Sequence, residues 1–118
     1  MRNALALSVA MALAVSLAVP LGAQQRTIKG EVVDLDCYTK DPKAVGKAHE
    51  QCAISCARQG KPQGILAADG VYLIAGDYTK DKNAKLIEFV AKIVEAKGEV
   101  TEKDGKKIIT VTSMTAAK

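Results

Sequence analysis

Residues 63–75, which read Q-G-I-L-A-A-D-G-V-Y-L-I-A, decide the fold. Two apolar segments, residues 63–68 and 71–75, flank the dipeptide Asp69-Gly70. An Asp-Gly pair between apolar runs is a strong short-range signal for a β-hairpin. The sequence therefore predicts two antiparallel strands in the middle of the chain.

Further strands are predicted on both sides of this hairpin. Upstream, residues 27–35 (T-I-K-G-E-V-V-D-L) form a β-rich run in which Gly30 indicates a bulge or a sharp bend. Downstream, Asn83 can cap a short helix over residues 84–90. Residues 93–112 then read as strand, turn and strand, with the turn at Lys103-Asp104-Gly105.

Five short strands joined by Gly and Asp-Gly turns predict a mainly β (α+β) fold. We expect a five-stranded, OB-like, partly closed barrel, because closure removes the exposed sheet edges that five open strands would leave. An open α+β sheet with one helix packed across it is the alternative. The barrel is expected to be one small domain, residues 24–118.

The first 23 residues are predicted to be a signal peptide. A short polar start is followed by an uncharged apolar run from Leu5 to Leu21, with small residues at Gly22 and Ala23. The run is shorter than the ~20 residues that a spanning helix needs. We therefore expect a periplasmic or secreted protein with no stable membrane span after cleavage.

A helix predicted between the first strand and the central hairpin carries most of the reactive side chains. Residues 47–59 are predicted to be helical, with Gly60 and Pro62 as stop signals. At about 100° per residue, His49, Cys52 and Cys56 lie on one narrow stripe of this helix. Cys37, which directly follows the first strand, could reach the same place through the loop of residues 36–46.

These four side chains form a C-x11-H-x2-C-x3-C array that contains every cysteine and the only histidine of the chain. Three thiolates and one imidazole can bind a metal ion tetrahedrally, and their softness favours zinc or copper. We therefore predict that Cys37, His49, Cys52 and Cys56 are metal ligands in a non-enzymatic metal-binding or electron-transfer module. Covalent haem is disfavoured because C-x-x-C-H is absent.

The sequence alone leaves two other uses of the thiols open. Cβ atoms four residues apart on a helix lie roughly 5 to 6 Å from each other, too far for a disulfide, so any bridge should join Cys37 to Cys52 or Cys56. The domain would then be a disulfide-stapled module that binds another exported protein. A thiol-based enzyme that uses Cys52 or Cys56 with His49 is the third class.

Two neighbouring acids and the overall composition bear on these alternatives. Asp34 and Asp36 lie close to Cys37, and Asp36 could orient the site by accepting a hydrogen bond from His49, although a solvated loop acid is the more common situation. The formal net charge is +4, without a block of like charge, and only four aromatic residues are present. Binding of nucleic acid, which needs stacking platforms and a basic groove, is therefore not expected.

A pattern of residues runs along nearly all of the mature chain: Gly30-Glu31-Val32-Val33-Asp34, Cys37-Tyr38, His49, Cys52-Ala53, Cys56-Ala57, Gly60, Pro62 and Gly64, followed by Gly70, Tyr72, Asn83, Leu86, Gly98 and Val100. With this pattern the chain resembles a family of small exported bacterial proteins with an OB-like β-barrel and no settled function. The resemblance implies export and the barrel fold. It supplies no reaction.

Overall fold

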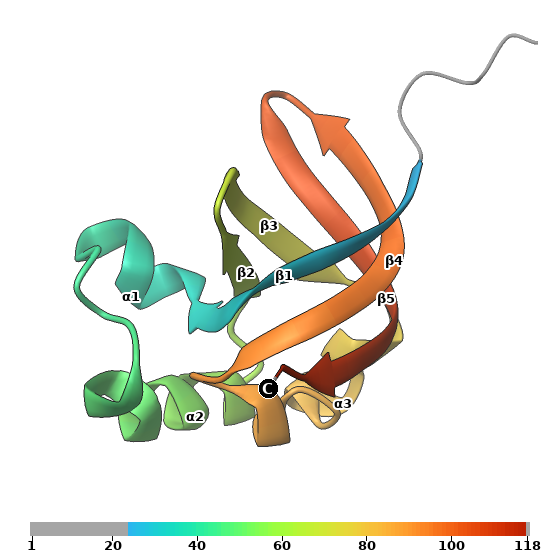
Figure 1. Cartoon of the computed structure of the whole chain (residues 1–118). Helices are drawn as coiled ribbons and strands as arrows, with labels where there is room; N and C mark the ends of the chain where they lie inside the picture. Colours follow the sequence, from blue (N-terminus) through green and yellow to red (C-terminus); the bar gives the residue numbers. More distant parts are fainter. Residues whose placement is uncertain (1–23, 118) are drawn as a thin grey trace, which may run out of the picture.

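The computed structural model describes residues 24–117, which form a closed five-stranded β-barrel (Figure 1). The strands follow one another around the barrel in the order β1-β2-β3-β5-β4. Their bounds are β1 (Gln24–Asp34), β2 (Gln63–Ala67), β3 (Gly70–Ala75), β4 (Ile93–Lys103) and β5 (Lys106–Ala116). The predicted five-stranded OB-like barrel is confirmed, and its ring of strand pairing is complete.

Strand β1 closes the barrel because it pairs on both edges. Its first part pairs with β4 and its last part with β2, and the two pairings overlap at Gly30 and Glu31. A Cβ at Gly30 would collide with the backbone carbonyl of Leu66, so glycine permits the close approach of β2 there. The register irregularity of the barrel lies instead between Lys97 and Gly98, where β4 bends against β5.

Both predicted Asp-Gly turns are present. The two-residue loop Ala68-Asp69 joins β2 to β3, which begins at Gly70, and Asp104-Gly105 joins β4 to β5. Asp104 and Gly105 have φ values of 52° and 75°. A two-residue turn with positive φ at both positions matches the twist of the flanking strands, which explains why the dipeptide predicts the hairpin so well.

The connection from β1 to β2 carries two helices, α1 (Leu35–Lys40) and α2 (Glu50–Arg58), the second preceded by a 3-10 turn, η1 (Lys47–His49). The predicted helix over residues 47–59 is confirmed in position. The expected loop over residues 36–46 is partly wrong, because it begins as α1. Asp34 caps this helix by accepting a hydrogen bond from the Asp36 backbone N–H at 3.1 Å.

The connection from β3 to β4 is helical only in short pieces. It contains η2 (Asp77–Thr79), α3 (Lys80–Asn83) and η3 (Ile87–Phe89), so a short helix before the C-terminal hairpin is confirmed and a regular helix over residues 84–90 is wrong. Asn83 has a positive φ, and its side-chain amide donates to the carbonyls of Ala57 and Lys61, both at 2.9 Å. It therefore joins two connections instead of capping a helix.

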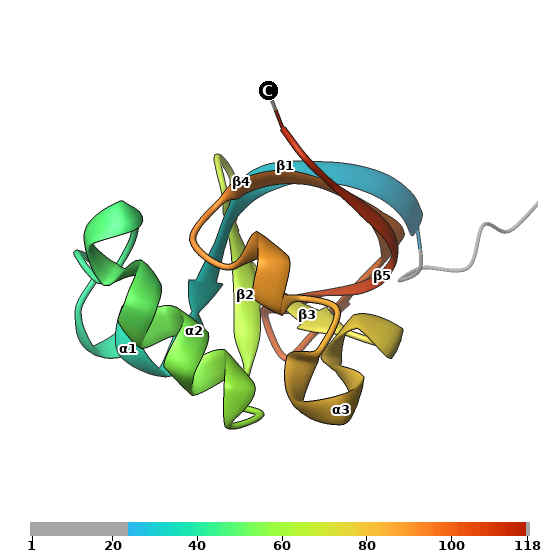
Figure 2. The ribbon, with the colours of Figure 1, turned by 90° about the horizontal axis from the view of Figure 1, so that it is seen from below.

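The two connections cover one end of the barrel, where α2 and α3 lie side by side (Figure 2). Ala53 and Ala57 of α2 pack into the same core as Leu86 and Val90 of the second connection. The barrel interior is filled by buried apolar side chains from all five strands, among them Val32, Ile65, Tyr72, Val94 and Ile109. The predicted signal peptide, residues 1–23, lies outside the described residues.

Candidate metal centre

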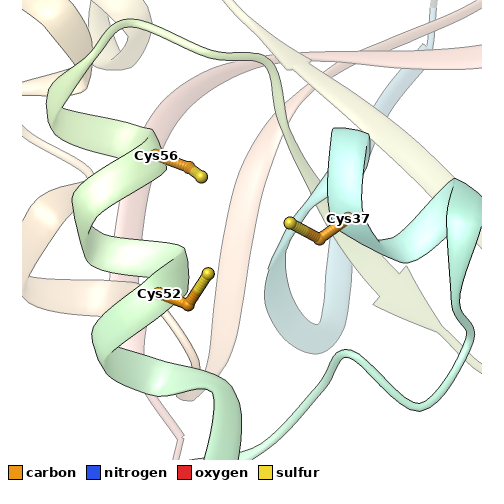
Figure 3. Close-up of side chains that lie close together, drawn as sticks. All are labelled: Cys37, Cys52 and Cys56. Carbon is orange, nitrogen blue, oxygen red and sulfur yellow. The ribbon is translucent and has the colours of Figure 1, made fainter.

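The three cysteines meet at the edge of the barrel, between α1 and α2. Cys37 projects from α1 toward α2, and Cys52 and Cys56 project from α2 toward α1 (Figure 3). The three sulfur atoms all lie within 4.8 Å of one another. The structure thus brings together three of the four residues predicted to be metal ligands.

The sequence of α2 fixes this orientation of the cysteines. Ala53 and Ala57 are buried in the core, so Cys52 and Cys56, one position earlier in each turn, are rotated sideways toward α1. Cys52 is exposed, whereas Cys56 and Cys37 are half-buried. Gly60, with a φ of 80°, ends the segment in the left-handed conformation.

Asp34 is the buried acid of the centre, at the end of β1. Its side chain is completely buried, and its Oδ1 atom accepts the capping hydrogen bond from Asp36. The second oxygen, Oδ2, is buried and has no hydrogen-bond partner within residues 24–117. Leaving a buried polar atom unpaired costs about 1–3 kcal/mol, so this oxygen indicates a ligand or a bound proton donor.

The Asp34 carboxylate controls the acidity of two thiols. It raises the pKa of Cys37 to about 12, mainly as an acceptor beside the thiol, followed by desolvation and by charge repulsion from Asp34. The same causes, in the same order, raise the pKa of Cys56, which Lys61 partly opposes. The contacts between the thiols and Asp34 fall outside ordinary hydrogen-bond geometry, so Oδ2 counts as unpaired although Asp34 lies close enough to disfavour ionisation of both thiols. A proton on each thiol is therefore favoured until something replaces it.

His49 lies on the Cys37 side of the centre. One of its ring nitrogens, a carboxylate oxygen of Asp34 and the sulfur of Cys37 all lie within 4.8 Å of one another. The predicted helical stripe does not hold at His49, because this residue ends the 3-10 turn η1 and precedes α2. A 3-10 turn has three residues per turn, so the rotation of 100° per residue does not apply there.

Of the two readings of Asp36, the structure supports the solvated acid and not the acid that orients the site. Asp36 does not orient the centre: its side chain is 47% exposed and its carboxylate faces Lys61 at 4.0 Å. Asp34 is the acid among the ligand atoms. The sequence signal for Asp34 is its place directly before a helix, which predicts a cap, but its burial depends on how β1 packs.

The donor set fits a transition-metal ion. Three sulfur atoms, one buried carboxylate oxygen and one imidazole nitrogen are ligand types that zinc and copper(I) accept. The three cysteines are free thiols, and no disulfide joins them. The alternative of a disulfide between Cys37 and a helical cysteine is thus not supported within residues 24–117.

Two hollows in the surface differ in their chemistry. One, of about 410 Å³, is lined by Cys37 and His49 together with Lys40, Asp41 and Lys43, and gives access to the centre from solvent. The other, of about 580 Å³, lies over Val71 and Leu73 of β3 and is lined by none of the predicted ligands. Cys37 and His49 can therefore be reached from solvent through the smaller hollow.

No family model, curated protein or solved structure matches this chain. The resemblance to small exported barrel proteins stays a prediction. Within residues 24–117, no helix is long and apolar enough to cross a membrane.

Proposed function

We propose that this protein is an exported, non-enzymatic domain that binds a thiophilic transition-metal ion, copper(I) or zinc, through Cys37, Cys52 and Cys56. The observation that carries the proposal is the convergence of three sulfur atoms within 4.8 Å, from two different helices. Thiolates are the ligands that copper(I) and zinc prefer among protein side chains.

The geometry needs only a small adjustment to hold such an ion. With Zn–S bonds of about 2.3 Å, tetrahedral ligands have sulfur atoms roughly 3.8 Å apart. Sulfur atoms within 4.8 Å of one another must therefore approach by at most about 1 Å, which side-chain rotation can supply. The exposure of Cys52 on α2 leaves it free to rotate.

The acidity of the thiols favours metal binding over thiol catalysis. A cysteine nucleophile needs a lowered pKa, whereas Asp34 raises the pKa of Cys37 and Cys56. A metal ion, by contrast, displaces the thiol protons as its bonds to sulfur form. The protonated thiols also react slowly with oxidants, which preserves free ligands in an oxidising compartment.

The proposal is tested with the reduced, untagged mature protein under anaerobic conditions. Native mass spectrometry after addition of copper(I), or of zinc, is expected to show one ion bound, and a chelator should return three thiols that can be alkylated. Replacement of Cys52 and Cys56 together by serine should lower copper(I) affinity at least 100-fold in competition with a chromogenic chelator. Ser55→Ala, on the exposed side of α2, is the matched control and should leave affinity unchanged.

The opposite result is also well defined. If the purified protein instead contains one disulfide and one free thiol, and the reduced form retains neither metal, the disulfide-stapled interaction module is the correct function.

Export and a protein partner belong to the same proposal. The apolar segment of residues 5–21 and the resemblance to exported barrel proteins support export. The exposed thiol of Cys52 supports transfer of the ion to or from an exported partner by ligand exchange. Cell fractionation tests the location: recovery of the full-length chain in the cytoplasm would contradict it.

A further inference from the structure

We propose that Asp34, Cys37 and His49 form a second metal-binding position, suited to a divalent ion of borderline softness such as Zn²⁺, Co²⁺ or Ni²⁺. It shares Cys37 with the three-sulfur set but does not depend on Cys52 or Cys56. The position can therefore be tested separately, in a protein that lacks Cys52 and Cys56.

Two buried, unpartnered polar atoms carry this inference. Asp34 Oδ2 and His49 Nε2 are both buried and have no hydrogen-bond partner within residues 24–117. Each belongs to a residue whose ligand atom lies within 4.8 Å of the Cys37 sulfur and of the other. A metal ion bound among these three atoms would satisfy the carboxylate oxygen and the imidazole nitrogen together.

The backbone around the three side chains is already fixed. The capping bond from the Asp36 N–H holds Asp34 Oδ1 and leaves Oδ2 pointing away from it. The Gly46 N–H donates to the Glu31 carboxylate at 2.8 Å, which ties the loop before His49 to β1. The His49 N–H in turn donates to the Gly46 carbonyl at 3.1 Å. The ligands thus need little ordering on binding.

The chemistry of the set differs from that of three sulfur atoms. One carboxylate oxygen, one thiolate and one imidazole nitrogen suit divalent ions of borderline softness, whereas a purely sulfur set favours copper(I). The hollow of about 410 Å³ lined by Cys37 and His49 leaves room for water as the remaining ligand. On binding, the Cys37 thiol loses its proton to solvent, a metal–sulfur bond forms, and nothing is oxidised or reduced.

The test removes the three-sulfur set and keeps the mixed set. The untagged Cys52→Ser/Cys56→Ser double variant is titrated anaerobically with Co²⁺. We expect one equivalent to bind, with a charge-transfer absorption of single-thiolate intensity. Further replacement of His49 by Gln, or of Asp34 by Asn, should weaken binding at least tenfold. Asp36→Asn in the same background is the matched control and should bind Co²⁺ as before.

A second readout needs no change at His49. Because His49 is the only histidine, its imidazole gives a single set of proton and nitrogen resonances. Saturating Zn²⁺ should shift these resonances in the double variant, with Asp36→Asn behaving identically. Circular dichroism of each variant separates loss of binding from loss of folding.

Three outcomes would overturn the proposal. The first is a folded double variant that does not bind Co²⁺. The second is Co²⁺ binding that survives both His49→Gln and Asp34→Asn. The third is a tenfold loss of copper(I) affinity when His49→Gln is made in the wild-type protein. The last result would place His49 in the three-sulfur set. Failure of copper(I) binding by the wild-type protein, with Co²⁺ binding retained by the double variant, would overturn only the function proposed above.

Discussion

The two connections at the closed end of the barrel use buried polar groups in opposite ways. In the connection from β3 to β4, the Asn83 amide satisfies two backbone carbonyls, and Leu86 and Val90 seal the core. At the start of the connection from β1 to β2 and within it, Asp34 Oδ2 and His49 Nε2 have no hydrogen-bond partner among residues 24–117, and three thiols face one another. The paired Asn83 amide is typical of a structural plug, and the unpaired ligand atoms make the second connection the candidate binding site.

The difference follows from how each connection obtains its stability. The plug places apolar side chains into the barrel, where burial stabilises them without any ligand. The site connection contributes mainly Ala53 and Ala57 to the core and keeps its larger polar side chains at the edge. Its stability is therefore expected to rise when the ligand atoms bind a metal ion.

The largest expected effect is on the plug. Leu86→Ala removes a completely buried side chain and should lower the free energy of unfolding by about 2–5 kcal/mol. Leu35→Ala, at the half-buried start of the site connection, is the comparison and should cost distinctly less. Urea denaturation of the metal-free proteins measures both. Equal losses would show that both connections support the core alike.

Metal should stabilise only through the site connection. Zinc at about 100 times its dissociation constant should raise the free energy of unfolding by about 2.7 kcal/mol, less any binding to the unfolded chain. Cys37→Ser should abolish this gain, because Cys37 belongs to both ligand sets. Leu86→Ala is the control: it lowers stability but should keep the full gain. Persistence of the gain in Cys37→Ser would contradict the proposed ligands.

In the metal-free protein, high pH should lower the stability of the site connection. The folded state raises the pKa of Cys37 from 9.0 to about 12, so between these values the folded thiol keeps a proton that the unfolded thiol has lost. The contribution of the Cys37 thiol to the free energy of unfolding is fully present below pH 9 and is lost as the pH rises toward 12. Wild type should lose more stability over this range than Cys37→Ser. If the free energy of unfolding falls equally with pH in the wild type and in Cys37→Ser, the raised pKa of Cys37 does not affect stability.

The smallest effect concerns the relative reactivity of the thiols. In the metal-free protein, Cys52 should be alkylated first, because it is exposed, whereas Cys37 and Cys56 are half-buried and have raised pKa values. Peptide mass spectrometry over time gives the three rates. Asp34→Asn should speed the alkylation of Cys37 and Cys56 and leave Cys52 unchanged. Faster alkylation of Cys37 than of Cys52 in the wild type would contradict the structure.

Local signals predicted most of the fold. The Asp-Gly pairs at residues 69–70 and 104–105 mark both hairpins, because few residues tolerate the positive φ found at Gly70, Asp104 and Gly105. Gly60 marks the end of the cysteine helix for the same reason. The helix expected over residues 84–90 is wrong, since Asn83 serves a neighbouring connection rather than its own.

The sequence by itself determined the barrel, the positions of its turns and the helix that carries Cys52 and Cys56, because periodicity and turn chemistry act over a few residues. The tertiary structure brought Cys37 to these two cysteines. Only the tertiary structure decided which polar atoms share the centre. It placed Asp34 among the ligand atoms, directed Asp36 toward Lys61, and grouped His49 with Cys37. Burial and ligand distances arise from the packing of β1, α1 and α2 against one another, and such contacts between segments distant in sequence leave no local signal.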